Sequence, residues 1–151
     1  LPANEPCKIC IYFTAAHGST AKMAEAIADG IREAGAEAEI FDALGLNIPD
    51  HFDRLEQADA ILFGSPTINN DAAKPVWDII NSMTTLDTKG KVAGSFGSFG
   101  WSGEAVPFMD ERLKNLKFKV PFDGLKVNLV PSSDDLAACR EFGANIAKSV
   151  Q

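Results

Sequence analysis

The regular exchange of two apolar patterns along the chain constrains its fold more than any other feature. Short runs of β-branched and apolar residues predict strands at residues 8–13, 37–41, 60–64, 91–96 and 125–130. Between them, apolar residues recur at helical spacing, most clearly in the stretches 23–31, 76–83, 106–116 and 134–150, and more weakly in 51–57. Strand-then-helix units with short connections predict an α/β fold in three layers, with a doubly wound, five-stranded parallel sheet covered on both faces.

Length and charge narrow the class of protein. The chain has 151 residues, 46% of them hydrophobic, which suffices for one ordinary core. We expect residues 1–6 to form a proline-flanked linker and residues 7–151 to form one domain, cut from a longer parent. The net charge of −7 repels nucleic-acid phosphates and anionic lipids, and no apolar run approaches the roughly 20 residues that span a bilayer. The sequence therefore predicts a cytoplasmic protein that binds neither nucleic acid nor membranes.

The cysteines do not indicate a redox or metal site. Their number, three, is odd, which excludes a complete disulfide framework and favours a reducing compartment. Cys7 and Cys10 form a Cys-x-x-Cys, but Cys10 falls inside an expected strand, whereas a thioredoxin-like pair opens a helix. Cys139, in the last expected helix, is interpreted as a buried structural thiol.

The loop after the first expected strand is the first candidate site, because ligands of doubly wound sheets bind beyond the carboxyl ends of the strands. This loop lacks both the dinucleotide fingerprint Gly-x-Gly-x-x-Gly and the P-loop. Hydroxyl groups at a helix N-terminus favour an anion such as phosphate, although Ser and Thr are also ordinary N-caps there. The loop alone leaves both interpretations open. Its residues are Thr14, Ala15, Ala16, His17, Gly18, Ser19 and Thr20.

Two further loops favour a planar ligand. The loop after the third strand has adjacent amides that tolerate positive φ and present backbone groups to a ligand; it comprises Ser65, Pro66, Thr67, Ile68, Asn69 and Asn70. The loop after the fourth strand holds two aromatic rings among glycines, where a core rarely places them; it comprises Ser98, Phe99, Gly100, Trp101, Ser102 and Gly103. One loop for a phosphate and two for a planar ring predict a flavin site. Asp71 and Glu104 adjoin these ring loops, and no Lys or Arg occurs in any of the three loops.

Together these loops resemble the flavodoxin family, and more narrowly the flavodoxin-like domain of flavodiiron proteins. The narrower resemblance rests on the segments 18–24 (GSTAKMA), 64–70 (GSPTINN) and 97–103 (GSFGWSG), with 135–140 (DLAACR) in the last helix. It covers nearly the whole chain, from Lys8 to Ala147. The resemblance implies FMN as the cofactor, the strand order 2-1-3-4-5, and electron delivery to a diiron centre outside this chain.

The resemblance also assigns roles to the loops. The segment 14–20 would bind the phosphate, with Ser19 and Thr20 as its hydroxyl donors, and the segments 65–70 and 98–103 would lie on either side of the ring. No side chain needs to act as a nucleophile or general base, since the flavin carries the electrons.

The sequence departs from the flavodoxin pattern at a few positions. Ala15 and Ala16 stand where flavodoxins commonly place hydroxyl residues, which removes hydrogen bonds to the phosphate. His17 is either a replacement donor or an exposed turn residue. Phe99 stands where tyrosine is frequent.

The implied partners are a diiron domain, in the parent chain or a partner subunit, and an upstream reductant such as a rubredoxin or a flavin reductase. The metals must lie elsewhere, because His17 and His51 are the only histidines, and His51 is expected at the surface. The main alternative is a free-standing flavodoxin shuttle or a flavodoxin-like quinone reductase. A cofactor-free interaction module is a further alternative.

A response-regulator receiver shares the expected fold but is disfavoured. Thr14, Gly64-Ser65 and Pro131-Ser132 stand where a receiver needs its acidic pair, its aspartate and its lysine.

Overall fold

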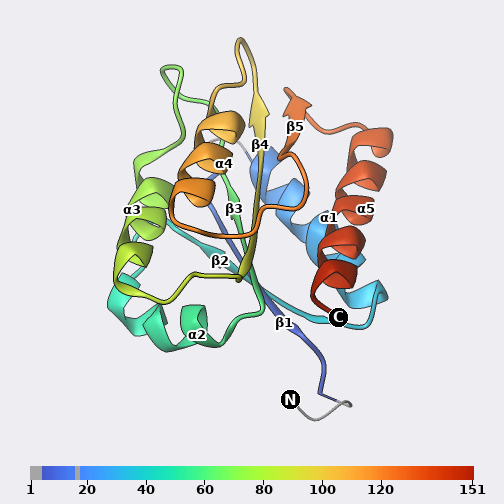
Figure 1. Ribbon diagram of the computed structural model, residues 1–151. Helices are drawn as coiled ribbons and strands as arrows, with labels where there is room; N and C mark the ends of the chain where they lie inside the picture. The colour runs from blue at the N-terminus through green and yellow to red at the C-terminus, as the bar shows by residue number, and fades with distance from the viewer. Residues whose placement is uncertain (1–4, 16–17) are drawn as a thin grey trace.

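The computed structural model describes residues 5–15 and 18–151. A parallel sheet runs through the centre of the molecule (Figure 1). Its strands lie in the spatial order β2-β1-β3-β4-β5, which confirms the expected topology. The strands are β1 (Lys8–Phe13), β2 (Glu37–Asp42), β3 (Ala60–Gly64), β4 (Val92–Phe99) and β5 (Leu125–Asn128).

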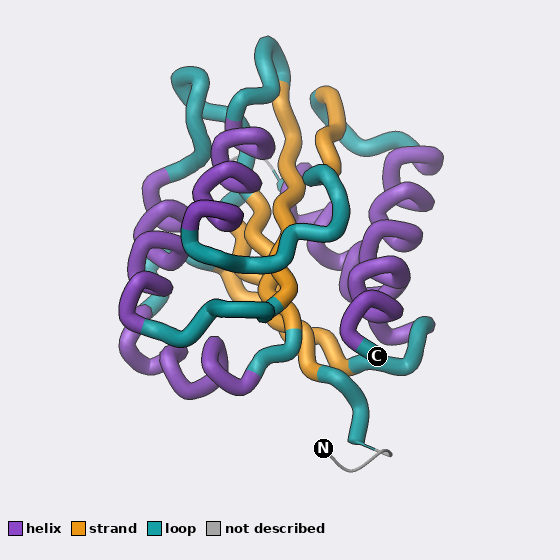
Figure 2. The backbone as a smooth tube through the Cα atoms, in the orientation of Figure 1, coloured by secondary structure: helices purple, strands orange, loops and turns teal. Residues whose placement is uncertain are grey.

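Helices cover both faces of the sheet, so the three-layer prediction is also confirmed (Figures 1 and 2). One face is covered by α1 (Ser19–Glu33) and α5 (Ser133–Val150). The other is covered by α2 (Phe52–Gln57), α3 (Lys74–Ser82) and α4 (Ala105–Asn115), with the short 3-10 turns η1 (Ile48–His51) and η2 (Met83–Thr85).

The core consists of two apolar layers, one on each face of the sheet. Successive strand residues point to opposite faces, so Ile11 packs toward α1 and α5 while Tyr12 packs toward α2 and α3. All residues of the central strand β3 are buried, which explains why its sequence is a continuous apolar run and not an alternating one.

The backbones of α1 and α5 touch at two glycines. A Cβ atom at Gly30 would lie 1.9 Å from the carbonyl oxygen of Arg140, and one at Gly143 would lie 2.1 Å from the carbonyl oxygen of Ile27. Neither position accepts a larger residue without a shift of the helices. This contact fixes α1, whose N-terminus lies at the carboxyl end of β1, in its position on the sheet.

The two ends of the domain lie at one edge of the sheet. The Cys7 Sγ atom, just before β1, donates to the carbonyl oxygen of Val150 at 3.2 Å. The Gln151 Nε2 atom donates to the carbonyl oxygen of Ala34 at 2.7 Å. The start of β1 and the end of α5 are therefore neighbours.

Two of the three thiols lie in the core. Cys10 and Cys139 are buried and unbridged, and burial raises the pKa of each to about 11. No group of three or more His, Cys, Asp or Glu side chains suited to a metal ion occurs among residues 5–15 and 18–151. Within the same residues, no helix has the length and apolar character needed to cross a bilayer.

Candidate functional site

The three loops singled out in the sequence meet at the carboxyl edge of the sheet, around one cavity of about 330 Å³. Eight of the predicted site residues line it: Ser19, Thr20, Pro66, Thr67, Ile68, Ser98, Phe99 and Gly100. The others described by the structure do not line the cavity itself: Thr14, Ala15, Gly18, Ser65, Asn69, Asn70, Trp101, Ser102 and Gly103. Ala16 and His17, also predicted for this site, lie outside the described residues.

The start of α1 supports the anion interpretation over the N-cap interpretation. The N-cap residue is Gly18, in the left-handed region at φ 85°, and no side chain in the described part of the chain caps this helix. Ser19 and Thr20 are the first residues of the helix, and the Thr20 side chain is buried, with its Oγ1 3.2 Å from the Ser98 Oγ. The first N–H groups of a helix have no partner within it and remain suited to an anion.

The side chain of Thr14 also supports an anion site in this loop. Its backbone N–H donates to the carbonyl oxygen of Gly64 at 3.0 Å, which fixes Thr14 beside the end of β3. Its Oγ1 is buried and has no hydrogen-bond partner among residues 5–15 and 18–151. A buried hydroxyl without a partner costs about 1–3 kcal/mol, so such groups are uncommon. A phosphate at this loop would supply the acceptor, and the residues present therefore fit the phosphate of FMN.

The loop after β3 is a tight hairpin turn. Ile68 and Asp71 exchange both backbone hydrogen bonds, with N···O distances of 2.7 and 3.0 Å. Asn69 and Asn70, at the tip, have φ values of 50° and 64°, as in a type I′ turn. The expectation that these amides adopt positive φ is confirmed.

Two side chains that the sequence placed in or beside the ring loops hold this turn in place. The Ser65 hydroxyl accepts from the Ala73 N–H and donates to the Pro66 carbonyl oxygen, both at 2.8 Å. The Asp71 Oδ1 accepts from the Ala72 N–H at 2.7 Å and from the Trp77 Nε1 at 2.9 Å. The hydroxyl of Ser65 is thus already used within the loop, and its backbone N–H donates to the carbonyl oxygen of Phe96 at 3.1 Å, so Ser65 supports the loop.

The two ring loops are bound to each other. The Thr67 N–H donates to the carbonyl oxygen of Ser98 at 3.1 Å, and the Thr67 Oγ1 accepts from the Ala105 N–H at 3.2 Å. The Ser102 Oγ lies 3.2 Å from the Asn70 Oδ1 and 2.8 Å from the Glu104 Oε2. These contacts join two distant segments of the sequence.

Trp101, in the loop after β4, projects into solvent, with 97% of its surface exposed. It is therefore not a core residue, which removes the main competing interpretation of an aromatic ring at this position. An apolar ring held in water at the rim of a cavity is available to cover a ligand.

A cation reaches the ring loop from β5, which the sequence did not indicate. A Cβ atom at Gly103 would lie 3.2 Å from the Lys126 Cδ, so the lysine stem packs against this glycine. The three loops themselves contain no Lys or Arg, and the neighbouring strand supplies the positive charge.

The turn after β5 also lines the cavity, through Leu129 and Val130. The sequence expectation placed the site only in the loops after the first, third and fourth strands, and it was incomplete. The strand expected over 125–130 ends at Asn128 because Leu129 turns into the left-handed region at φ 58°. Nothing in the residue type leucine signals such a turn.

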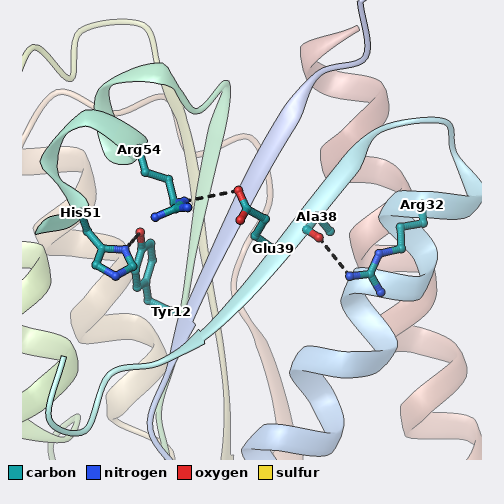
Figure 3. A network of polar contacts seen from close by, with 6 residues as sticks. All are labelled: Tyr12, Arg32, Ala38, Glu39, His51 and Arg54. Atoms are coloured by element: carbon teal, nitrogen blue, oxygen red, sulfur yellow. Dashed lines mark hydrogen bonds and ion pairs between the residues drawn. The ribbon is translucent and has the colours of Figure 1, made fainter. Parts of the chain in front are cut away.

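A polar and aromatic cluster joins the strands β1 and β2 to η1 and α2, and its role is structural (Figure 3). His51, expected at the surface, is instead half-buried: its Nδ1 lies 2.9 Å from the Tyr12 Oη, and its ring packs edge-on against Phe41. Burial lowers the pKa of His51. The Arg54 guanidinium stacks over Phe41 and its Nε lies 3.4 Å from the Glu39 Oε1.

The backbone of the edge strand β2 also accepts a hydrogen bond from α1. An Arg32 guanidinium nitrogen donates to the carbonyl oxygen of Ala38 at 2.9 Å (Figure 3). Together these contacts fasten α1 and α2 to the β2 edge, and none of their residues lines the cavity.

Comparison with known proteins identifies the family. The sequence matches the flavodoxin family over residues 11–143. The chain belongs to the flavodoxin family. FMN is accordingly its cofactor.

The chain is also homologous to flavodiiron proteins. It is 42% identical over 144 residues to flavo-diiron protein FprA2 of Clostridium acetobutylicum, covering 94% of this chain and 36% of that protein. It superposes on the rubredoxin oxygen:oxidoreductase of Desulfovibrio gigas with a TM-score of 0.90 at 29% identity, covering 97% of this chain and 37% of that one.

A single-domain relative matches as well. Flavodoxin 1 from Bacillus cereus superposes with a TM-score of 0.85 at 33% identity, and the match covers 95% of this chain and 99% of that one. The chain spans about a third of the length of the curated relatives that it matches first. It is therefore homologous to one domain of those longer proteins.

Proposed function

We propose that this chain is the FMN-bearing electron-transfer domain of a flavodiiron protein and delivers electrons to a diiron centre outside this chain. The observation that carries the proposal is the cavity at the carboxyl edge of the sheet, which is lined by the first residues of α1, by two linked loops and by the turn after β5. In the loop before α1, the buried Thr14 hydroxyl has no partner among residues 5–15 and 18–151. The identity of 42% to a protein named as flavo-diiron supports the choice of this branch of the family.

The proposed cofactor contacts are those that the family resemblance implies. Thr14, Ser19 and Thr20, with the backbone around Gly18, would hold the phosphate, and Ala15, Ala16 and His17 complete that loop. The turn from Ser65 to Asn70 and the loop from Ser98 to Gly103 would hold the ring between them. When bound, FMN accepts a pair of electrons and releases them singly, and the residues of this chain hold, orient and shield it.

The proposed partners are a diiron domain and an upstream reductant such as a rubredoxin or a flavin reductase. The name of the D. gigas relative, rubredoxin oxygen:oxidoreductase, supports the rubredoxin class of donor. We propose a cytoplasmic location because the cysteines are unbridged, and a domain over residues 7–151 preceded by a linker over residues 1–6. Residues 1–4 lie outside the described part of the chain.

A free-standing flavodoxin shuttle or a flavodoxin-like quinone reductase is the second candidate. The observation that favours it is the match to Flavodoxin 1 of B. cereus, which is covered over 99% of its length. A shuttle would transfer electrons to a protein acceptor and a quinone reductase to a quinone, in both cases without a diiron partner.

The decisive experiment compares acceptors for the FMN-loaded chain under one chemical reductant. Consumption of oxygen or nitric oxide is measured for the chain alone, for free FMN at the same concentration, and for the chain with a flavodiiron metal domain added. We expect the chain alone to match free FMN within a few-fold, and the added domain to accelerate consumption by orders of magnitude. Rapid quinone reduction by the chain alone, with no acceleration by the metal domain, would favour the second candidate.

A further inference from the structure

The turn between β5 and α5 contains a residue whose identity neither packing nor backbone conformation explains. Leu129 lies at φ 58°, a conformation that costs a branched apolar residue energy and that glycine or asparagine adopts readily. Its side chain is 62% exposed, and that of Val130 is 67% exposed, so the core does not require either. Strained backbone at an exposed residue is typical of a functional position.

The geometry gives the turn a place in the cofactor site. Leu129 and Val130 both line the cavity, and they belong to none of the three family loops. The Leu129 N–H donates to the carbonyl oxygen of Phe99 at 2.7 Å, and a Cβ atom at Gly100 would lie 3.4 Å from the Leu129 Cδ2. The leucine is thus fastened to the backbone of the ring loop, with its side chain beside Gly100.

We infer that Leu129 and Val130 form a fourth, apolar wall of the FMN site, and that Leu129 adopts its left-handed conformation in order to place its side chain against the flavin ring. The inference rests on the proposed FMN site. Leu129 is bonded to Phe99 and lies beside Gly100, both in the loop after β4, so the wall is placed at the ring portion of the ligand. Binding removes these exposed apolar surfaces from water, which stabilises the complex.

The substitution Leu129→Asn separates contact with the ligand from support of the fold. Asparagine is favoured at positive φ and is similar in length, so the unbound chain should unfold at the same or a higher urea concentration. We expect the dissociation constant of FMN to rise about tenfold, because an apolar contact with the ring is lost. Leu129→Gly should give the same two changes, which excludes an effect specific to the amide.

Lys117 provides a matched control. It is another non-glycine residue at positive φ, 73°, it is exposed, and it does not line the cavity. Lys117→Gly should raise the unfolding midpoint and leave the dissociation constant of FMN unchanged. Riboflavin, which lacks the phosphate, provides a second test. Leu129→Asn should weaken the binding of riboflavin and of FMN by the same factor.

The titration also distinguishes the failure of this inference from the failure of the proposed function. If the unsubstituted chain binds no FMN, the proposed function fails and the fourth wall fails with it. If the chain binds FMN and Leu129→Asn changes the dissociation constant by less than about twofold, only the wall is refuted. A parallel loss of FMN affinity and of unfolding midpoint, or a loss for FMN without one for riboflavin, also overturns it.

Discussion

The hydroxyl groups of Thr20 and Ser98, 78 residues apart in the sequence, lie 3.2 Å from each other. Thr20 belongs to the first turn of α1 and Ser98 to the last residues of β4. One hydrogen bond therefore joins the helix at the phosphate loop to the strand that carries a ring loop. The pair therefore links the two halves of the cofactor site.

Thr20→Val tests the pair, since valine keeps the shape of the side chain and removes its hydroxyl. We expect the dissociation constant of FMN to rise by about ten- to a hundredfold, as one charge-assisted hydrogen bond to the phosphate is lost. The free energy of unfolding of the apoprotein should fall by about 1 kcal/mol, because Ser98 loses its partner. Fluorescence titration with FMN and urea unfolding measure the two effects. Thr84→Val, at an exposed threonine of η2, should change neither.

Trp101→Ala should affect binding without affecting the fold. The side chain is almost fully exposed, so its removal should change the free energy of unfolding of the apoprotein by less than about 0.5 kcal/mol. Stacking on a planar ring contributes about 1–3 kcal/mol, so FMN should bind about one to two decades more weakly. Unchanged affinity in the same titration would show that Trp101 does not cover the ring. Leu44→Ala, at an exposed apolar residue outside the cavity, is the control.

The charges around the ring loops should set the reduction potential of the bound cofactor. Asp71 and Glu104 disfavour the addition of electrons, so Asp71→Asn with Glu104→Gln should raise the midpoint potential. An asparagine at position 71 retains an oxygen acceptor for Ala72 and Trp77, so the turn is preserved. Lys126→Met should lower the potential, since it removes the cation beside Gly103. A redox titration in which neither protein departs from the unsubstituted chain would refute this electrostatic account.

Asp110 should impose an unusual pH dependence on stability. It is buried, its Oδ1 accepts from the Ser95 Oγ at 2.6 Å, and its Oδ2 accepts from the Gly124 N–H at 2.8 Å. Burial raises the pKa of Asp110, and the two hydrogen bonds only partly oppose this rise. The folded state therefore holds the proton more tightly than the unfolded state. Between the unfolded and the folded pKa, the contribution of this carboxyl to the free energy of unfolding falls as the pH rises.

Asp110→Asn, which is neutral at every pH, removes that contribution. The variant's free energy of unfolding, relative to the unsubstituted chain, should increase from about pH 3.5 upward and level off above the folded pKa. Urea unfolding of both proteins across this range measures the difference. A difference between Asp110→Asn and the unsubstituted chain that is independent of pH would contradict the prediction.

Most of the fold could be predicted because its signals are local. The apolar run of β3 and the spacing of Met23, Ile27 and Ile31 in α1 each follow from the burial of one segment. The positive φ of Asn69 and Asn70 was likewise predicted, since short amide side chains favour that region.

The parts that the sequence did not predict depend on contacts between distant segments. Leu129 adopts positive φ against its own preference, and only its hydrogen bond to Phe99 shows why its turn belongs to the site. The proximity of Lys126 to Gly103 depends on the register of β5 against β4. His51 is half-buried because the Tyr12 hydroxyl lies within hydrogen-bond distance across the β1 face. None of these relationships leaves a pattern in a single stretch of residues.

The proximity of Cys7 to Val150 has a mechanical consequence for the whole domain. Cys7 and Val150 lie at the base of the sheet, and β1, β3 and β4 end at the opposite edge (Figure 1). The loops that line the cavity follow the ends of these strands. The start of β1 and the end of α5 are therefore separated from the cofactor site by the full length of the central strands.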